Sequence, residues 1–124
     1  MADHLRWLWR RCERPDGRWV RSHHADGRRK DLTFQADQQL YPLVELADYW
    51  RRSGVLPSGI AWDVAIAGAW QAALEEVDAA SGLMASGESA ADDPAVAPFI
   101  AASQILLWYA GRRVAELADA AGLD

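Results

Sequence analysis

Two adjacent carboxylates, Asp92 and Asp93, have the residue types and spacing that best suit acid–base chemistry. Neighbouring carboxylates disfavour each other's ionisation, which can leave one of them protonated near neutral pH, as a general acid requires. Glu88 lies nearby in the sequence and could complete an acidic cluster. A structural interpretation stays open, because Asp93 precedes Pro94 and could cap a helix that begins at this proline.

A second polar group surrounds the expected start of another helix. Asp37, Gln38 and Gln39 could hydrogen-bond hydroxyl groups, while the rings of Phe34 and Tyr41 could pack against the C–H face of a sugar. The alternative is local, since acidic side chains offset the positive end of a helix dipole and glutamine favours helices. The group therefore predicts either a sugar-binding site or ordinary helix-start chemistry.

Other reactive residue types lack a partner at a useful spacing. Consecutive histidines, His23 and His24, would point to opposite faces of a strand, and no second Cys/His group has metal-ligand spacing. Cys12 is the single cysteine and has no base at a recognisable distance along the chain. The sequence contains no glycine-rich phosphate loop and no GxSxG elbow. We expect neither a metal nor another cofactor.

These polar groups must be positioned by helices, because apolar residues recur at helical spacing in four stretches. The stretches cover residues 2–13, 35–52, 57–80 and a last segment from Pro94 or Pro98 to residue 121. Turn residues flank a short alternating segment within residues 14–31, which predicts a β-hairpin or an ordered loop. Pro42 interrupts the second helix and is easiest to accept in its first turn or at a kink. No internal repeat is evident, and the expected fold class is all-α.

Length and composition limit the chain to one domain, residues 1–124, with 51% hydrophobic residues. The net charge of −5 divides into about +5 over residues 1–30 and about −10 over the remainder. The arginines of the basic part are interleaved with acidic residues, so we do not expect nucleic acid as a partner. No apolar run reaches the roughly 20 residues of a membrane span and no secretory pattern is present, which favours a cytoplasmic protein without a membrane partner.

Two blocks of the chain resemble a known family. The first is Asp37-Gln38-Gln39-Leu40-Tyr41-Pro42-Leu43-Val44-Glu45-Leu46-Ala47-Asp48-Tyr49-Trp50, followed by Gly54. It is similar to a helix of (α/α)6-toroid glycoside hydrolases, in particular the metal-independent exo-α-mannosidases and the glycogen-debranching amylo-glucosidases. The second is Ser89-Ala90-Ala91-Asp92-Asp93-Pro94 with the apolar segment after it, which is similar to the exo-mannosidase loop with the sequence RPSDD. The likeness spans roughly residues 15–118.

The resemblance implies an inverting, metal-independent hydrolase of α-glycosidic bonds that acts on an oligosaccharide or glycan. By this match, Asp92 or Asp93 would be the general acid and Asp37 would contact the sugar. From their residue types, we expect the other substrate contacts to be Gln38, Phe34, Tyr41 and Glu88. No carboxylate of the chain matches the general base of that family.

The family's ring contains twelve helices, so four helical segments would form an arc of the (α/α)6 toroid. We therefore expect a partial domain, inactive alone, whose exposed helix faces could self-associate. The alternative function is a small helical protein–protein interaction module with a face rich in tryptophan, of which the chain has seven. A DNA-associated role of the basic segment ranks third.

Overall fold

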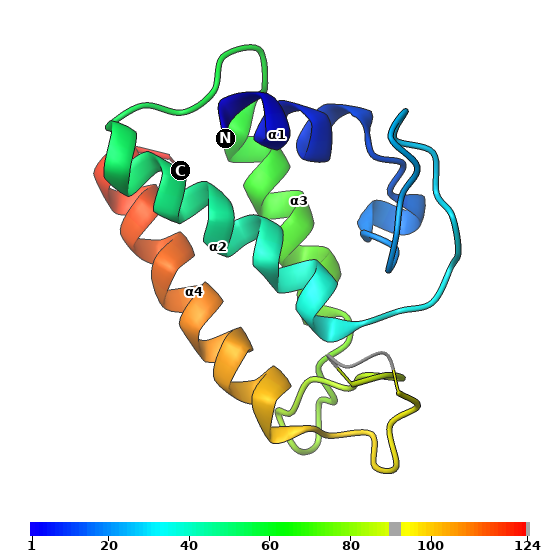
Figure 1. Ribbon diagram of the computed structural model, residues 1–124. Coiled ribbons are helices and arrows are strands. Elements are labelled where there is room, and N and C mark those ends of the chain that lie inside the picture. Colours follow the sequence, from blue (N-terminus) through cyan, green and yellow to red (C-terminus); the bar gives the residue numbers. More distant parts are fainter. Residues whose placement is uncertain (90–92, 124) are drawn as a thin grey trace.

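The computed structural model describes residues 1–89 and 93–123, and it is mostly helical (Figure 1). The described residues form four α-helices, which are α1 (Ala2–Arg6), α2 (Ala36–Ser53), α3 (Trp62–Leu74) and α4 (Ala101–Ala121). A π-helical turn, Trp7–Arg11, continues α1, and a 3₁₀ turn covers Pro15–Gly17. Isolated β-bridges occur, but no strand is present in this part of the chain. The prediction of an all-α fold is confirmed at this level.

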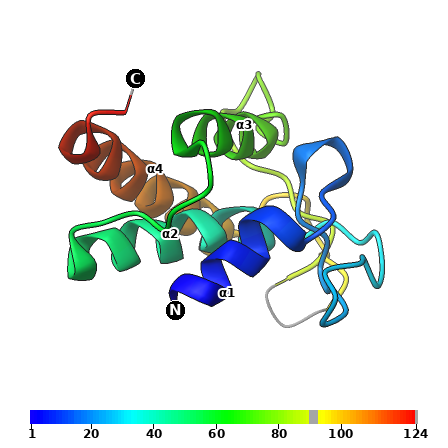
Figure 2. The same ribbon diagram turned by 90° about the horizontal axis from the view of Figure 1, so that it is seen from above.

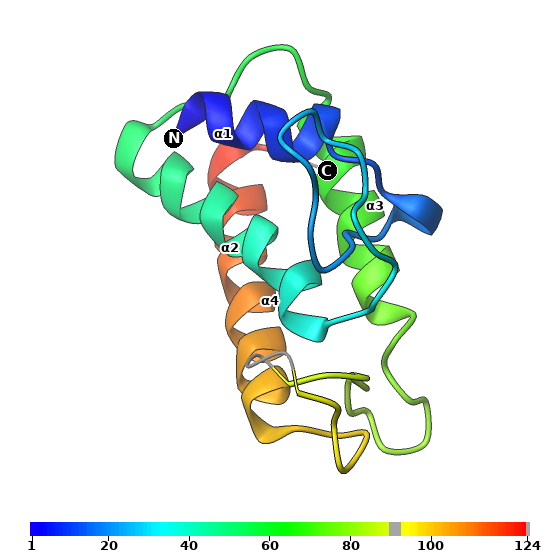
Figure 3. The ribbon, with the colours of Figure 1, turned by 45° about the vertical axis from the view of Figure 1, so that its right-hand side comes forward.

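Helices α2 and α4 form the centre of the arrangement. They lie side by side and run in the same direction, whereas α3 returns in the opposite direction along α2 (Figures 1 and 3). Helix α1 crosses the other face of α2 (Figure 2). Arg113 of α4 is buried and donates a hydrogen bond to Asp48 of α2 over 2.8 Å, which links the two central helices by an ion pair.

The main hydrophobic core lies where all four helices meet. Its buried apolar residues include Leu5, Trp9, Leu43, Leu46, Ile66 and Leu117. A second, smaller cluster joins the start of α2, the middle of α4 and the end of α3, and consists of Ala36, Leu40, Ala73, Met84 and Ala110. No helix among the described residues is both long enough and apolar enough to cross a bilayer.

Most tryptophans belong to the core and do not share one exposed face. The ring of Trp9 packs edge-on against Trp19 at 4.9 Å and against Trp62 at 5.3 Å between centroids. The guanidinium of Arg14 lies 4.6 Å from the centroid of the Trp19 ring. Trp108 of α4 is the exception, since 62% of its surface is exposed.

Residues 14–31 form an ordered loop, which is the second of the two predicted alternatives; the β-hairpin is not observed. A single antiparallel bridge joins His23 and Arg29. Next to this bridge, the N–H of Lys30 donates to the carbonyl of Ser22 and the N–H of His24 donates to the carbonyl of Arg28. The pairing does not extend into the predicted strand, because both backbone groups of Trp19 bond to the side chain of Gln39 in α2.

The predicted boundaries of the last two helices are wrong. Helix α4 begins at Ala101, not at Pro94 or Pro98, because residues 93–99 are held to residues 85–89 by backbone hydrogen bonds and bridges. Asp93 is therefore not a helix cap. Helix α3 is shorter than residues 57–80, since Gly59 adopts a positive φ of 86° before it and Val77 forms a bridge after it.

Pro42 lies inside α2 as its seventh residue, beyond the first turn, which was one of the two positions that the sequence favoured. It has no N–H, so the carbonyl of Gln38 cannot receive the usual bond from residue 42. Helix α2 nevertheless continues to Ser53 and ends at Gly54, whose φ of 70° is the left-handed conformation that terminates helices.

Two glutamine side chains hold the loops against the central helices in the same way. Gln39 accepts from the backbone N–H of Trp19 at 2.9 Å and donates to its carbonyl at 2.5 Å. Gln104 accepts from the N–H of Met84 at 2.9 Å and donates to its carbonyl at 2.8 Å. Each glutamine is the fourth residue of its helix, and each clamps a residue 20 positions earlier.

The expectation that no repeat is present is corrected by these clamps. The spacing Phe-x-Ala-x-x-Gln occurs at residues 34–39 and again at residues 99–104, about 65 positions later. With the same offset, α2 corresponds to α4, and α1 with its π turn corresponds to α3 at an offset of about 60. The described chain therefore consists of two units of the same design, each with one helix, a loop and a clamped second helix.

Candidate functional site

Three of the predicted sugar contacts line one hollow at the starts of α2 and α4. Asp37 and Tyr41 come from the first turns of α2, and Glu88 comes from the loop before α4. The first turns of α4 complete the wall with Ile100, Ala102, Ser103 and Leu106. The hollow has a volume of about 70 Å³. Ligand pockets usually measure at least about 300 Å³, so this hollow can form only part of a site for a sugar.

Glu88 is held in the wall of the hollow by an arginine. Its side chain is 17% exposed, and Arg21 Nη1 lies 3.1 Å from Glu88 Oε2 and 3.4 Å from Oε1. A carboxylate fixed in this way has remaining lone pairs that can accept hydrogen bonds from hydroxyl groups. The arrangement suits a residue that orients a ligand.

Arg21 also joins Glu88 to a second carboxylate. Its Nε lies 3.5 Å from Asp31 Oδ2, which in turn accepts from Ser22 Oγ at 2.7 Å. Burial acts to raise the pKa of Asp31, but hydrogen bonds from Ser22 and the backbone of Thr33, with the charge of Arg21, outweigh it and lower the pKa. Asp31 therefore remains a charged anchor for Arg21 at neutral pH.

The loop that carries Glu88 is fixed to the start of α2. Ser86 is buried, accepts from the backbone N–H of Ala36 at 3.3 Å and donates to the carbonyl of Glu88 at 2.6 Å. Gln35 Nε2 donates to the carbonyl of Ser89 at 3.2 Å. These bonds set the position of Glu88 relative to Asp37.

The two predicted catalytic residues differ in what the structure describes. Asp92 lies outside the described residues. Asp93 is exposed, and its carbonyl accepts from the N–H of Ser89 at 2.8 Å. This bond places the backbone of Asp93 beside the segment that carries Glu88.

The remaining predicted contacts lie apart from the hollow. Phe34 lines a different hollow, with Arg18 5.9 Å from the centroid of its ring. Gln38 is half-buried and is not among the residues that line the hollow. Gln39 is 1% exposed and its amide is bonded to Trp19, so it is not accessible to a sugar.

Among the described residues, no three His, Cys, Asp or Glu side chains gather closely enough to hold a metal ion. His23 Nε2 instead lies 2.9 Å from the carbonyl of Glu13. Burial raises the pKa of the Cys12 thiol to about 11, which suppresses its reactivity as a nucleophile.

Sequence reasoning missed Arg21 and Ser86, which position Glu88. Both act through contacts between segments 50 or more residues apart, and no local pattern marks them. The glutamine clamps were also missed, although the repeated Phe-x-Ala-x-x-Gln spacing was a signal that could have identified them. Comparison with known proteins finds no family model, no curated protein and no solved structure that matches this chain.

Proposed function

We propose that this chain forms two helical hairpins of a carbohydrate-active (α/α)6 hydrolase that cleaves α-linked glucose or mannose. The observation that carries the proposal is the convergence of Asp37, Tyr41 and Glu88 in one hollow. Asp37 and Tyr41 belong to the first sequence block that resembles the glycosidase family, and Glu88, about fifty positions later, directly precedes the second block. Carboxylates beside an aromatic ring are suited to hold sugar hydroxyls and a sugar's C–H face.

The arrangement of the helices supports this architecture. A toroid of helical hairpins needs neighbouring units of one design, with equivalent helices parallel and the intervening helices antiparallel to them. Helices α2 and α4 are such a parallel pair, and the Gln39 and Gln104 clamps mark them as equivalent. Further hairpins of the same kind would extend the arc.

Uncovered apolar side chains support the view that further hairpins cover these helices. Val64 of α3 is 70% exposed and Ile105 of α4 is 68% exposed. Helix α3 is also bounded by a shallow apolar hollow of about 400 Å³, lined among others by Ile60, Val64 and Gly68. Helices that are apolar around most of their circumference usually have neighbours on several sides.

In the complete enzyme, Asp92 or Asp93 acts as the general acid and protonates the leaving oxygen, while a carboxylate from another segment activates water. Glu88 and Asp37, which both line the hollow, bind substrate hydroxyls, and the reaction inverts the anomeric centre without a metal. The enzyme acts in the cytoplasm.

The test has two parts: the DNA on either side of this reading frame is sequenced, and the product of the complete gene is assayed. We expect an arginine-aspartate motif upstream, a catalytic carboxylate downstream, and hydrolysis of α-linked mannose or glucose oligosaccharides. Glu88→Gln should raise KM at least about tenfold, the effect of one lost charge-assisted contact. Glu75→Gln is the matched control, because Glu75 also pairs with an arginine but does not line the hollow. A gene product without these flanking motifs and without turnover would refute the proposal.

The second candidate is a protein–protein interaction module, which the exposed apolar residues of α3 and α4 favour. Sedimentation equilibrium of the chain tests it: an interaction module should form a defined oligomer, and Ile105→Ser should dissociate it. Val96→Ser is the control, because Val96 is fully exposed in a loop. A folded monomer at all concentrations contradicts self-association.

A further inference from the structure

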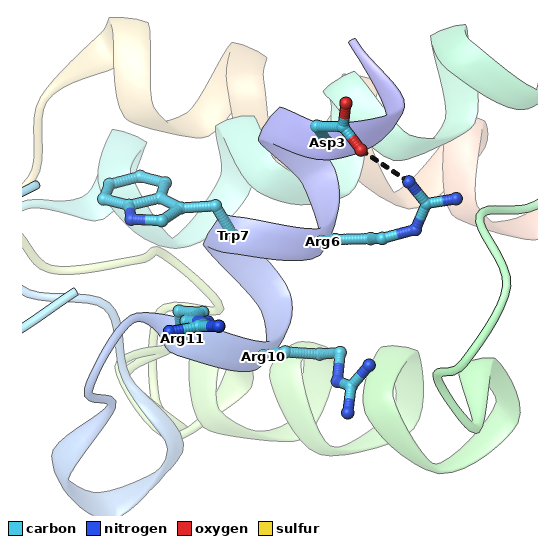
Figure 4. Close-up of a pocket in the computed structure, with 5 residues that line it drawn as sticks. All are labelled: Asp3, Arg6, Trp7, Arg10 and Arg11. Carbon is cyan, nitrogen blue, oxygen red and sulfur yellow. Dashed lines mark hydrogen bonds and ion pairs between the residues drawn. The ribbon is translucent and has the colours of Figure 1, made fainter. Parts of the chain in front are cut away.

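A basic groove lies on the outer face of the N-terminal helix, on a different element from the hollow described above. Its lining residues follow the helical spacing of one face and are Asp3, Arg6, Trp7, Arg10 and Arg11, around a volume of about 370 Å³. Trp7 and Arg11 project to one side of the helix, whereas Arg6 and Arg10 project to the other (Figure 4). The groove is therefore bordered by guanidinium groups on both sides.

The positive charge of this groove is incompletely neutralised. Arg6 donates to Asp3 over 2.6 Å, which accounts for the one acidic residue of the lining. Arg10 and Arg11 are exposed and form no ion pair with any residue that the structure describes. The lining thus carries a surplus of two positive charges, and arginines four residues apart on a helix repel each other. A bound anion would relieve this repulsion.

A neighbouring loop packs against the end of this helix and carries two further cations. The carbonyl of Ala25 accepts from Trp7 Nε1 at 2.9 Å, and Gly27 packs so closely that a Cβ there would lie 2.3 Å from the carbonyl oxygen of Arg11. Arg29 and Lys30 follow this contact in the sequence, and Arg29 lines a separate hollow with Arg18 and Phe34. Both are exposed and have no ion-pair partner in the described part of the chain.

We propose that this groove binds the phosphate group of a small phosphorylated molecule. Guanidinium groups donate two parallel hydrogen bonds to phosphate oxygens, and the two sides of the groove offer such donors around one anion. The indole of Trp7 provides a flat apolar surface for the part of the ligand next to the phosphate. A long polyanion fits less well, because Asp3, Glu13 and Asp26 interrupt the basic surface around the groove.

Inorganic pyrophosphate is the probe, titrated into the chain by isothermal calorimetry at constant ionic strength. We expect saturable binding with one site per chain, and amide shifts in an NMR titration that concentrate on residues 6–11. Arg10→Gln and Arg11→Gln should each weaken binding at least about tenfold. Arg51→Gln should change it less than twofold, since Arg51 is also exposed and unpaired among the described residues but does not line the groove.

Three results would overturn the proposal. The first is the absence of saturable pyrophosphate binding, and the second is equal affinity in all three variants, which would indicate unspecific attraction. The third is much tighter binding of duplex DNA with a steep salt dependence that involves Arg29 and Lys30, which would assign the surface to a nucleic acid. Because each substituted arginine is exposed, unchanged circular dichroism and melting should accompany the loss of binding.

Discussion

Replacement of Gln39 by leucine tests whether the glutamine clamp holds the loop of residues 14–31 to α2. Leucine has a similar volume and fills the same buried position. It removes both hydrogen bonds to Trp19 and leaves the N–H and the carbonyl of that residue without their partner. The loop should then lose its main polar attachment to the helix.

The expected cost follows from the two backbone groups that lose their partner. Each buried unsatisfied group costs about 1–3 kcal/mol, and the greater apolar surface of leucine offsets part of this loss. We expect Gln39→Leu to lower the free energy of unfolding by about 2–5 kcal/mol, a large share of the roughly 5–15 kcal/mol typical of a domain.

Urea denaturation followed by tryptophan fluorescence measures this change. Gln38→Leu is the matched control, because Gln38 is the preceding residue of the same helix and its side chain makes no hydrogen bond with the described residues. It should alter the free energy of unfolding by less than about 1 kcal/mol. Equal effects of the two substitutions would show that the bonds to Trp19 contribute nothing beyond local helix propensity.

Three further predictions concern the packing, the thiol and the proposed acid. Gly68→Ala should stabilise the chain by about 0.5–1 kcal/mol, because a Cβ at this position of α3 meets no atom within 4 Å. Gly111→Ala should be less favourable, because its Cβ would lie 3.2 Å from the ring of Trp70. Thermal melting of both variants tests this order of stability. Burial raises the pKa of the Cys12 thiol from 9.0 to about 11, so the unfolded chain loses this proton at a lower pH than the folded chain. The free energy of unfolding should therefore fall as the pH rises from 9.0 to about 11, and it should fall more in the wild type than in Cys12→Ala. In the complete enzyme, Asp92→Asn or Asp93→Asn should lower kcat at least about a hundredfold with little change in Tm, and full activity of both variants would exclude a general acid here.

The helices could be predicted because their apolar residues recur at helical spacing. Leu40, Leu43 and Leu46 all enter the core, and the bounds of α2 differ from the predicted range by one residue at each end. The start of α4 could not be placed this way. Pro94 and Pro98 are both acceptable first residues of a helix, and the segment is kept extended only by its pairing with residues 85–89.

The candidate site was predictable only in part, because its geometry depends on the contact between α2 and α4. Polar residues at a helix start look alike in sequence, whether they face a ligand, the solvent or a loop. Asp37 lines the hollow, whereas the side chain of Gln39, two residues later, is buried and bonded to Trp19. The side on which each residue lies follows from the packing partner of the helix.

The short span of the two glutamine clamps has a consequence for the order of folding. Each clamp closes a loop of 20 residues, whereas the ion pair between Asp48 and Arg113 joins positions 65 apart. Closing the shorter loops costs less chain entropy, and contacts between residues near in sequence generally form faster. We therefore expect each clamped helix to associate first with its own loop, and α4 to dock on α2 in a later step. The two hairpins would then fold one after the other during synthesis.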